Sequence, residues 1–97
     1  MNVVKEIRIE FPKYSVFSRI YITNNNISNF QISEFAQFAR MLVAHKDFEK
    51  LGDIKDLLEI PGVSEVLISA NYLRIWIRAG FRWEDVEPSI IEFFYQA

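Results

Sequence analysis

The side chains that could do chemistry are few and widely spaced in this sequence. His45 is the only histidine, and Asp47 and Glu49 follow it closely. A histidine can act as a general base or as a metal ligand. At the end of an apolar helical pattern, however, it more simply provides a cation at the negative end of the helix. The chain has no cysteine, so these residues offer no disulfide, thiolate metal site or cysteine nucleophile.

The remaining polar residues form no recognisable catalytic pattern. The serines lack the Gly-x-Ser-x-Gly context of a nucleophile, and the three glycines are too far apart to form a phosphate-binding loop. Glu84, Asp85 and Glu87 cluster where the last helix is expected to begin, and there carboxylates interact favourably with the positive helix end. Metal binding or acid–base chemistry is the alternative role for these three acids. We expect a protein that is not an enzyme and that has no cofactor or metal site.

Hydrophobic periodicity predicts the elements that must position the remaining candidates. Alternating apolar residues indicate strands, and apolar residues three or four positions apart indicate helices. We expect Ser33 to cap the first helix and Asp85 to cap the last, which would place Pro88 in the first helical turn. In chain order, the prediction is strands over residues 3–11 and 16–23, a helix over 33–45, a short helix from Asp53 to Pro61, strands over 63–69 and 72–78, and a final helix around 86–94.

This order predicts an α+β fold. We expect a four-stranded, mainly antiparallel sheet with two or three helices packed on one face, in the order β-β-α-α-β-β-α. The 97 residues are 51% hydrophobic and contain no repeat, which predicts a single domain over residues 1–97.

The predicted open face of the sheet combines basic and aromatic side chains. In the second strand, the alternation is interpreted with Ile20 and Ile22 facing inward, so that Phe17, Arg19 and Tyr21 face outward. Such a face can bind a protein partner or a second copy of the chain, or it can stack single-stranded nucleic acid. Alternatively, it is a solvated surface on which arginines cover aromatic rings. The candidate partner-binding residues are Arg19, Tyr21, Tyr72, Arg74, Trp76 and Arg78, with Arg8 and Phe17 beside them.

Net charge and hydropathy limit the classes of partner that we expect. The net charge of −2 gives no general attraction for nucleic acid. The N-terminus shows no signal-peptide pattern, and no apolar stretch approaches the length of a membrane-spanning helix. We therefore expect a cytoplasmic protein without a membrane partner.

The last part of the chain resembles a known family. Over residues 57–94, a Pro-Gly turn precedes a Val-x-x-Val strand, an Asn-Tyr turn, a β-branched strand, a tryptophan and a helix that ends in Phe-Phe. These positions are Pro61, Gly62, Val63, Val66, Asn71, Tyr72, Ile75, Trp83, Pro88, Ile90, Phe93 and Phe94. The pattern resembles the N-terminal domain of the Nfu/NifU-like iron–sulfur cluster scaffold proteins.

The resemblance implies a binding role. In that family a separate C-terminal domain carries the Cys-x-x-Cys motif that holds the cluster, whereas these 97 residues include no cysteine. The resemblance thus implies a stand-alone, divergent N-terminal-type module. We expect a non-catalytic protein-interaction module, accessory to iron–sulfur cluster assembly or delivery, whose partner is an iron–sulfur client or assembly protein or a second copy in a homodimer. Single-stranded nucleic-acid binding by the open face is the alternative.

Overall fold

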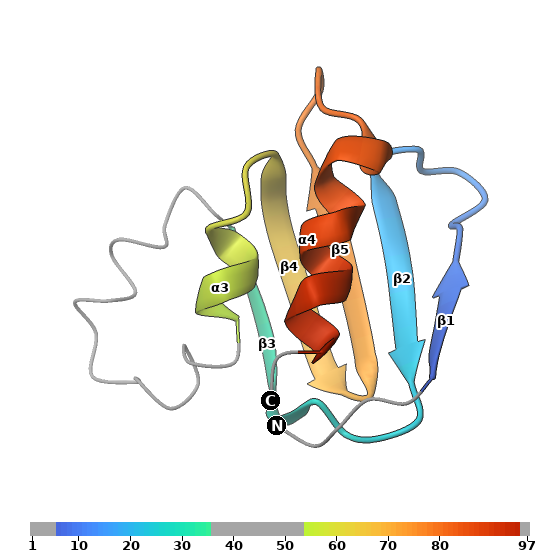
Figure 1. Cartoon of the computed structure of the whole chain (residues 1–97), viewed down its shortest axis with the longest axis vertical. Coiled ribbons are helices and arrows are strands. Elements are labelled where there is room, and N and C mark those ends of the chain that lie inside the picture. Colours follow the sequence, from blue (N-terminus) through green and yellow to red (C-terminus); the bar gives the residue numbers. More distant parts are fainter. Residues whose placement is uncertain (1–5, 36–53, 96–97) are drawn as a thin grey trace.

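The structure, a computed structural model, describes residues 6–35 and 54–95 (Figure 1). Five strands and two helices lie in these ranges. They are β1 (Ile7–Glu10), β2 (Ser18–Thr23), β3 (Ser28–Phe35), α3 (Lys55–Leu58), β4 (Val63–Ala70), β5 (Tyr72–Ile77) and α4 (Trp83–Tyr95).

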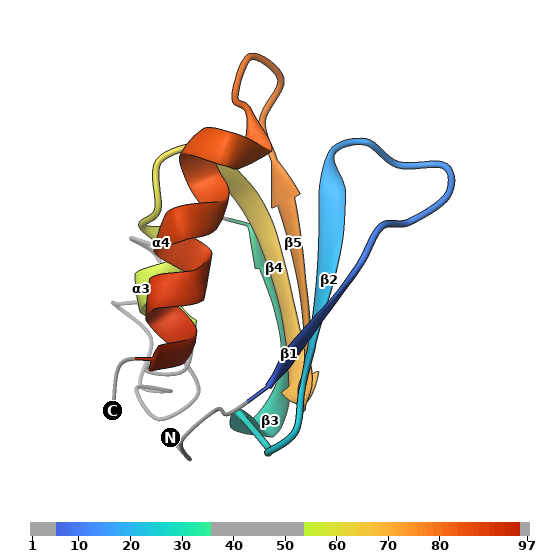
Figure 2. The same cartoon turned by 45° about the vertical axis from the view of Figure 1, so that its right-hand side comes forward.

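The strands form one antiparallel sheet in the order β1-β2-β5-β4-β3. Figure 2 shows α3 and α4 together on one face of this sheet. The predicted α+β class, the two hairpins and the one-sided helix layer are therefore confirmed. The four predicted strands are present as β1, β2, β4 and β5, and the sheet has a fifth strand that the sequence did not indicate.

The additional strand is β3, which occupies a position where a helix was expected to begin. Ser33 pairs with Leu67 of β4, so it lies within a strand and does not cap a helix. The cause is non-local, because β4 supplies the hydrogen-bonding partner for this segment. Residues 36–45 of the predicted helix, with His45, and the predicted cap Asp53 lie outside the described residues.

The core lies between the sheet and the two helices. On β5, Leu73 and Ile75 are fully buried and Ile77 is 5% exposed, as the alternation of this strand predicts. The other layer of the core consists of Ile54, which directly precedes α3, and of the helix residues Leu57, Leu58, Val86, Ile90, Phe93 and Phe94.

Helix α4 begins at Trp83, three residues earlier than expected. The backbone N–H of Val86 donates to the carbonyl of Arg82, so the helix already runs from Trp83. Asp85 consequently lies in the first turn and is not the cap, and Pro88 lies inside the helix. No helix in the described ranges is long and apolar enough to cross a membrane.

A two-residue turn joins β4 to β5 and ties this hairpin to the end of β2. Ala70 has a positive φ of 51°, which is uncommon for a residue with a Cβ. The Asn71 side-chain amide donates to the Thr23 carbonyl at 3.0 Å. The Thr23 backbone N–H donates to the Asn71 carbonyl at 2.9 Å. The turn therefore holds three strands in register.

Candidate interaction surface

Strand β5 places three of the predicted site residues on the open face of the sheet. Tyr72, Arg74 and Trp76 alternate with the buried side chains of the same strand, so they lie on the face away from the helices. All three are half-buried. The structure therefore brings these three predicted residues together.

Arg74 and Trp76 form a stacked pair. The Arg74 guanidinium carbon lies 4.6 Å from the centre of the Trp76 ring. Its NH2 group donates a 3.0 Å hydrogen bond to Ser18 Oγ, which itself donates to Ser15 Oγ. A fixed cation–π pair of this kind is favourable when it is partly removed from water.

The charge of Arg74 is not matched by an acid in the described part of the chain. The three ion pairs between described residues, Arg8–Glu10, Arg19–Glu87 and Arg82–Glu84, do not include it. Its Nε is buried and makes no hydrogen bond. A buried N–H group of a charged side chain that lacks a hydrogen-bond acceptor lowers the stability of the folded protein.

Apolar side chains from neighbouring strands surround this arginine. Directly opposite residues of antiparallel strands share a face of the sheet. Arg74 is opposite Ile20 of β2 on one side and Leu67 of β4 on the other, and Ile22 is opposite Tyr72. These neighbours are half-buried. The centre of the open face is thus an apolar surface around an arginine that has no acid partner among the described residues.

The prediction that Tyr21 lies on this face is wrong. Tyr21 is fully buried on the helix side of the sheet, and its ring centre lies 5.9 Å from that of Phe94. Its hydroxyl donates to Glu87 Oε1 of α4 at 2.9 Å. The pKa of the Tyr21 phenol is raised well above its usual range, because burial and then the neighbouring Glu87 carboxylate disfavour the phenolate.

Arg19 also lies on the helix side and not on the open face. Its NH1 group lies 2.9 Å from Glu87 Oε1, and its guanidinium carbon lies 4.8 Å from the ring centres of both Phe11 and Trp83. The alternation of β2 was predicted with its two faces exchanged. The isoleucines Ile20 and Ile22 face the open side, and Arg19 and Tyr21 use their long stems to reach Glu87 from the core side.

The other predicted residues lie at the margins of the open face. Arg78 is exposed just beyond β5, and its backbone N–H donates to the Gly62 carbonyl at 2.8 Å. Arg8 is exposed on β1 and pairs with Glu10 at 3.2 Å. Phe17, 48% exposed, precedes β2 and is not part of the sheet face.

The predicted acidic group does not converge on a common site. Glu84 pairs with Arg82, Glu87 binds Arg19 and Tyr21, and Asp85 is exposed. The described residues contain no cluster of three or more histidine, aspartate or glutamate side chains that could hold a metal ion.

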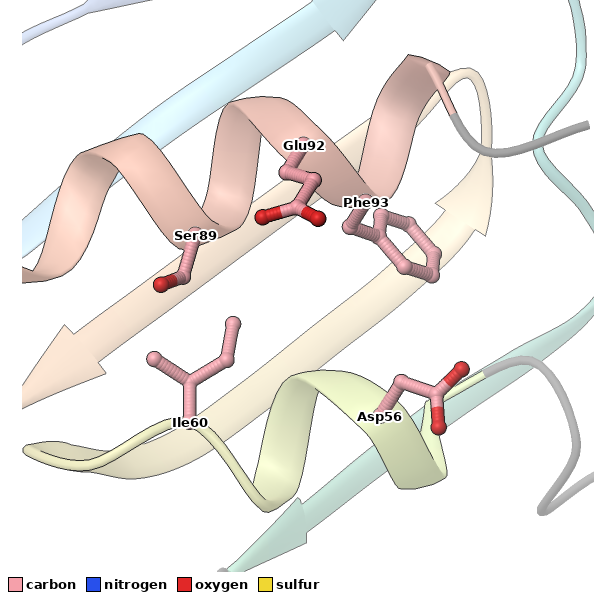
Figure 3. Close-up of a pocket in the computed structure, with 5 residues that line it drawn as sticks. All are labelled: Asp56, Ile60, Ser89, Glu92 and Phe93. Carbon is pink, nitrogen blue, oxygen red and sulfur yellow. The ribbon is translucent and has the colours of Figure 1, made fainter.

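A small cleft between α3 and α4 was not expected from the sequence (Figure 3). It has a volume of about 230 Å³ and is lined by Asp56, Ile60, Ser89, Glu92 and Phe93. Figure 3 shows Ser89 and Glu92 of α4 across from Ile60 and Asp56. No sequence pattern indicates this cleft, because it depends on the packing of two helices that are distant along the chain.

A comparison with solved structures agrees with this architecture. A solved structure that the chain resembles is the NMR structure of a NifU-like protein from Saccharomyces cerevisiae, with a TM-score of 0.63 and 15% sequence identity. The similarity covers 97% of this chain and 78% of that protein. The chain therefore has a NifU-like fold. No protein-family profile matches the sequence, and no curated protein matches it.

Proposed function

We propose that this protein is a non-catalytic protein-interaction module that is accessory to iron–sulfur cluster assembly or delivery. The observation that carries the proposal is the NifU-like fold across 97% of the chain. It agrees with the sequence pattern over residues 57–94, which resembles the N-terminal domain of the Nfu/NifU-like scaffolds. Because the 97 residues include no cysteine, they would act by recognising a protein and not by holding a cluster through thiolates.

The open face around Arg74 is the proposed binding surface. Arginine and tryptophan are the residue types that most often dominate binding energy at protein interfaces. Arg74 lies among apolar neighbours, and no acid pairs with it in the described ranges. A partner that presents a carboxylate within an apolar patch would satisfy both features.

The same geometry favours a different protein as the partner over a second copy of this chain. In a two-fold symmetric dimer formed through the face centre, Arg74 of one copy would approach Arg74 of the other. Two like charges brought out of water oppose association. Nucleic acid is also disfavoured, because the Arg74 guanidinium covers one face of the Trp76 ring and the net charge is −2.

The test is an affinity capture of the tagged protein from lysate of its own host, with mass spectrometry of the bound proteins. Trp76→Ala and Arg74→Lys alter the open face, and Arg82→Ala is the matched control, because Arg82 is exposed beyond the sheet and pairs with Glu84. A recovered protein is then purified and its affinity for each variant is measured by calorimetry. Melting temperatures show which variants remain folded.

We expect iron–sulfur proteins to be retained by the wild type and by Arg82→Ala. Trp76→Ala is expected to weaken binding of the purified partner by about tenfold or more, the size typical of a central interface residue. Unchanged affinity in Trp76→Ala and Arg74→Lys would remove the open face as the binding surface. Recovery of only unrelated proteins would limit the NifU-like resemblance to the fold.

A further inference from the structure

The cleft between α3 and α4 has an apolar floor and a carboxylate on each wall. Asp56 and Ile60 are four positions apart, so they share the side of the α3 segment that faces α4. On α4, Ser89, Glu92 and Phe93 share the facing side in the same way. Figure 3 shows Ser89 and Glu92 pointing toward Ile60, with Asp56 at the end of the cleft nearer Phe93. A ligand in the cleft would therefore contact both carboxylates and both apolar side chains.

The electrostatic environment of the cleft favours a cation. Glu92 lies in the last turn of α4, which contains no basic residue. The carbonyl groups at the end of a helix already carry partial negative charge, so an acid there is unfavourable until a cation compensates it. The three ion pairs between described residues include neither Asp56 nor Glu92. Two carboxylates and a negative helix end thus lie at the cleft without a basic partner in the described ranges.

The basic residues near the helices do not cancel this charge. Lys55 is adjacent to Asp56 along the chain, and adjacent helical residues point in different directions. Arg82 directly precedes α4, at its other end, and pairs with Glu84. Residues 36–53, which lie outside the described residues, contain as many acidic as basic residues. The acids of the helix layer, residues 54–62 and 81–95, are Asp56, Glu59, Glu84, Asp85, Glu87 and Glu92.

The size and lining of the cleft determine which kind of cation fits. Its volume of about 230 Å³ is below the range of about 300–1,000 Å³ that is usual for small-molecule sites, so the cleft suits a single side chain. A bare divalent metal ion prefers about six oxygen ligands, whereas the described residues contain no group of three or more potential ligands. Ile60 and Phe93 instead offer apolar surface for the stem of a long basic side chain.

We propose that the cleft binds an arginine side chain of a protein partner. The guanidinium group is planar and weakly hydrated, so it can lie against the Phe93 ring while its N–H groups donate to Asp56 and Glu92. Ser89 Oγ can accept a further hydrogen bond. The ammonium group of a lysine is more strongly hydrated and donates from one point, which suits two separated carboxylates less well.

This inference goes beyond the proposed function and does not depend on it. The cleft lies in the helix layer, whereas Arg74 and Trp76 lie on the opposite face of the sheet (Figure 2). Binding at either surface can therefore fail while binding at the other remains. The test uses arginine itself as the probe, so it requires no identified partner.

The experiment is an NMR titration of the whole isotope-labelled chain at low salt. The probe is arginine blocked as its N-acetyl N-methylamide, and the neutral control is the same derivative of citrulline, which has the shape of arginine without its charge. Magnesium chloride tests for a metal ion, and dilution of the protein alone tests for a second copy. The variants are Asp56→Asn and Glu92→Gln. Their matched control is Asp85→Asn, because Asp85 is an exposed acid in the first turn of α4.

We expect the arginine derivative to shift the backbone amide signals of the residues that line the cleft. The citrulline derivative should bind more weakly by about tenfold or more, because it forms no charge-assisted hydrogen bond with either acid. Asp56→Asn and Glu92→Gln should each weaken binding of the arginine derivative by about fivefold, the upper range for an exposed ion pair. Asp85→Asn should bind like the wild type, and added salt should weaken the binding.

Four results with the arginine derivative would overturn the inference. They are no shift of the cleft signals, equal affinity for the citrulline derivative, wild-type affinity in both cleft variants, and an equal loss in Asp85→Asn. Comparable shifts of the same signals with magnesium chloride would assign the cleft to a metal ion, and shifts on dilution would assign it to a second copy, and either would also overturn it. The substituted side chains are exposed, so melting temperatures should remain those of the wild type.

Discussion

The Tyr21 hydroxyl donates a 2.9 Å hydrogen bond to Glu87 Oε1 and thereby joins β2 to α4 across the core. The two residues are 66 positions apart in the sequence. Arg19 binds the same carboxylate oxygen at 2.9 Å. This three-residue contact connects the first hairpin to the last helix.

Removing the Tyr21 hydroxyl should destabilise the fold without altering its packing. Tyr21→Phe retains the buried ring but deletes a hydrogen bond to a charged acceptor, so we expect the free energy of unfolding to fall by about 1.5 kcal/mol. Urea denaturation measures this as a lower midpoint with an unchanged m-value. Tyr14→Phe is the matched control, because Tyr14 is 91% exposed, and it should leave the midpoint unchanged. Equal midpoints for the wild type and Tyr21→Phe would show that the bond adds nothing to stability.

The raised pKa of Tyr21 predicts a loss of stability at alkaline pH. The unfolded chain releases the phenol proton from about pH 10, whereas the folded chain retains it. Above that pH the folded state binds more protons than the unfolded state, so this contribution is complete below pH ~10 and declines at higher pH, by up to about 1.4 kcal/mol per pH unit.

Urea denaturation at a series of alkaline pH values tests this slope. Tyr21→Phe has no phenol at position 21, so its stability should decline less steeply than that of the wild type. The difference between the two proteins should therefore shrink as the pH rises. Parallel curves above pH ~10 would mean that Tyr21 ionises as readily in the folded state as in the unfolded state.

The sequence predicted the orientation of a strand correctly only where its two faces differ clearly in polarity. On β5, Leu73, Ile75 and Ile77 are apolar and Arg74 lies between them, so the alternation assigned both faces correctly. Tyr72, Arg74 and Trp76 were therefore placed on the correct face.

On β2, by contrast, each face could pack against the helices, and hydrophobicity alone assigned the wrong face to the core. Isoleucine is more apolar than arginine or tyrosine, which led to Ile20 and Ile22 being predicted inside. The actual choice depends on Glu87, which offers Arg19 and Tyr21 a charged partner on the helix side. Strand β3 was missed for a related reason, since its pairing with β4 is non-local. Local periodicity contains no information about either partner.

The two glycines with positive φ should respond differently to substitution. A Cβ on Gly62, whose φ is +94°, would lie 2.5 Å from Phe81 Cδ1, whereas a Cβ on Gly80, with φ +92°, would meet nothing within 4 Å. Gly80→Ala carries only backbone strain and should cost about 1 kcal/mol. Gly62→Ala adds a steric clash and should cost at least about 1 kcal/mol more. Thermal or urea denaturation of the two variants compares these costs.

The clash can be separated from the strain by shortening Phe81. In the Phe81→Ala background the ring is gone, so the extra cost of Gly62→Ala relative to Gly80→Ala should largely disappear. A double-mutant cycle measures this coupling. If the excess cost of Gly62→Ala persists without the ring, the nearby Val86 side chain, 3.0 Å from the added Cβ, is the source of the clash.

Replacing Pro88 should stabilise the protein, because proline occupies an interior position of α4. Its ring lacks the N–H that would donate to the carbonyl of Glu84, and proline in a helix interior is unfavourable. Pro88→Ala restores that donor but also gives the unfolded chain more freedom, which opposes the gain. We expect a net increase of about 1 kcal/mol in the free energy of unfolding. Ser89→Ala is the matched control, because Ser89 is an exposed neighbour whose backbone N–H is already present, and it should stabilise less. If Pro88→Ala instead lowers the denaturation midpoint, the proline contributes more by restricting the unfolded chain than it loses in the missing helical bond.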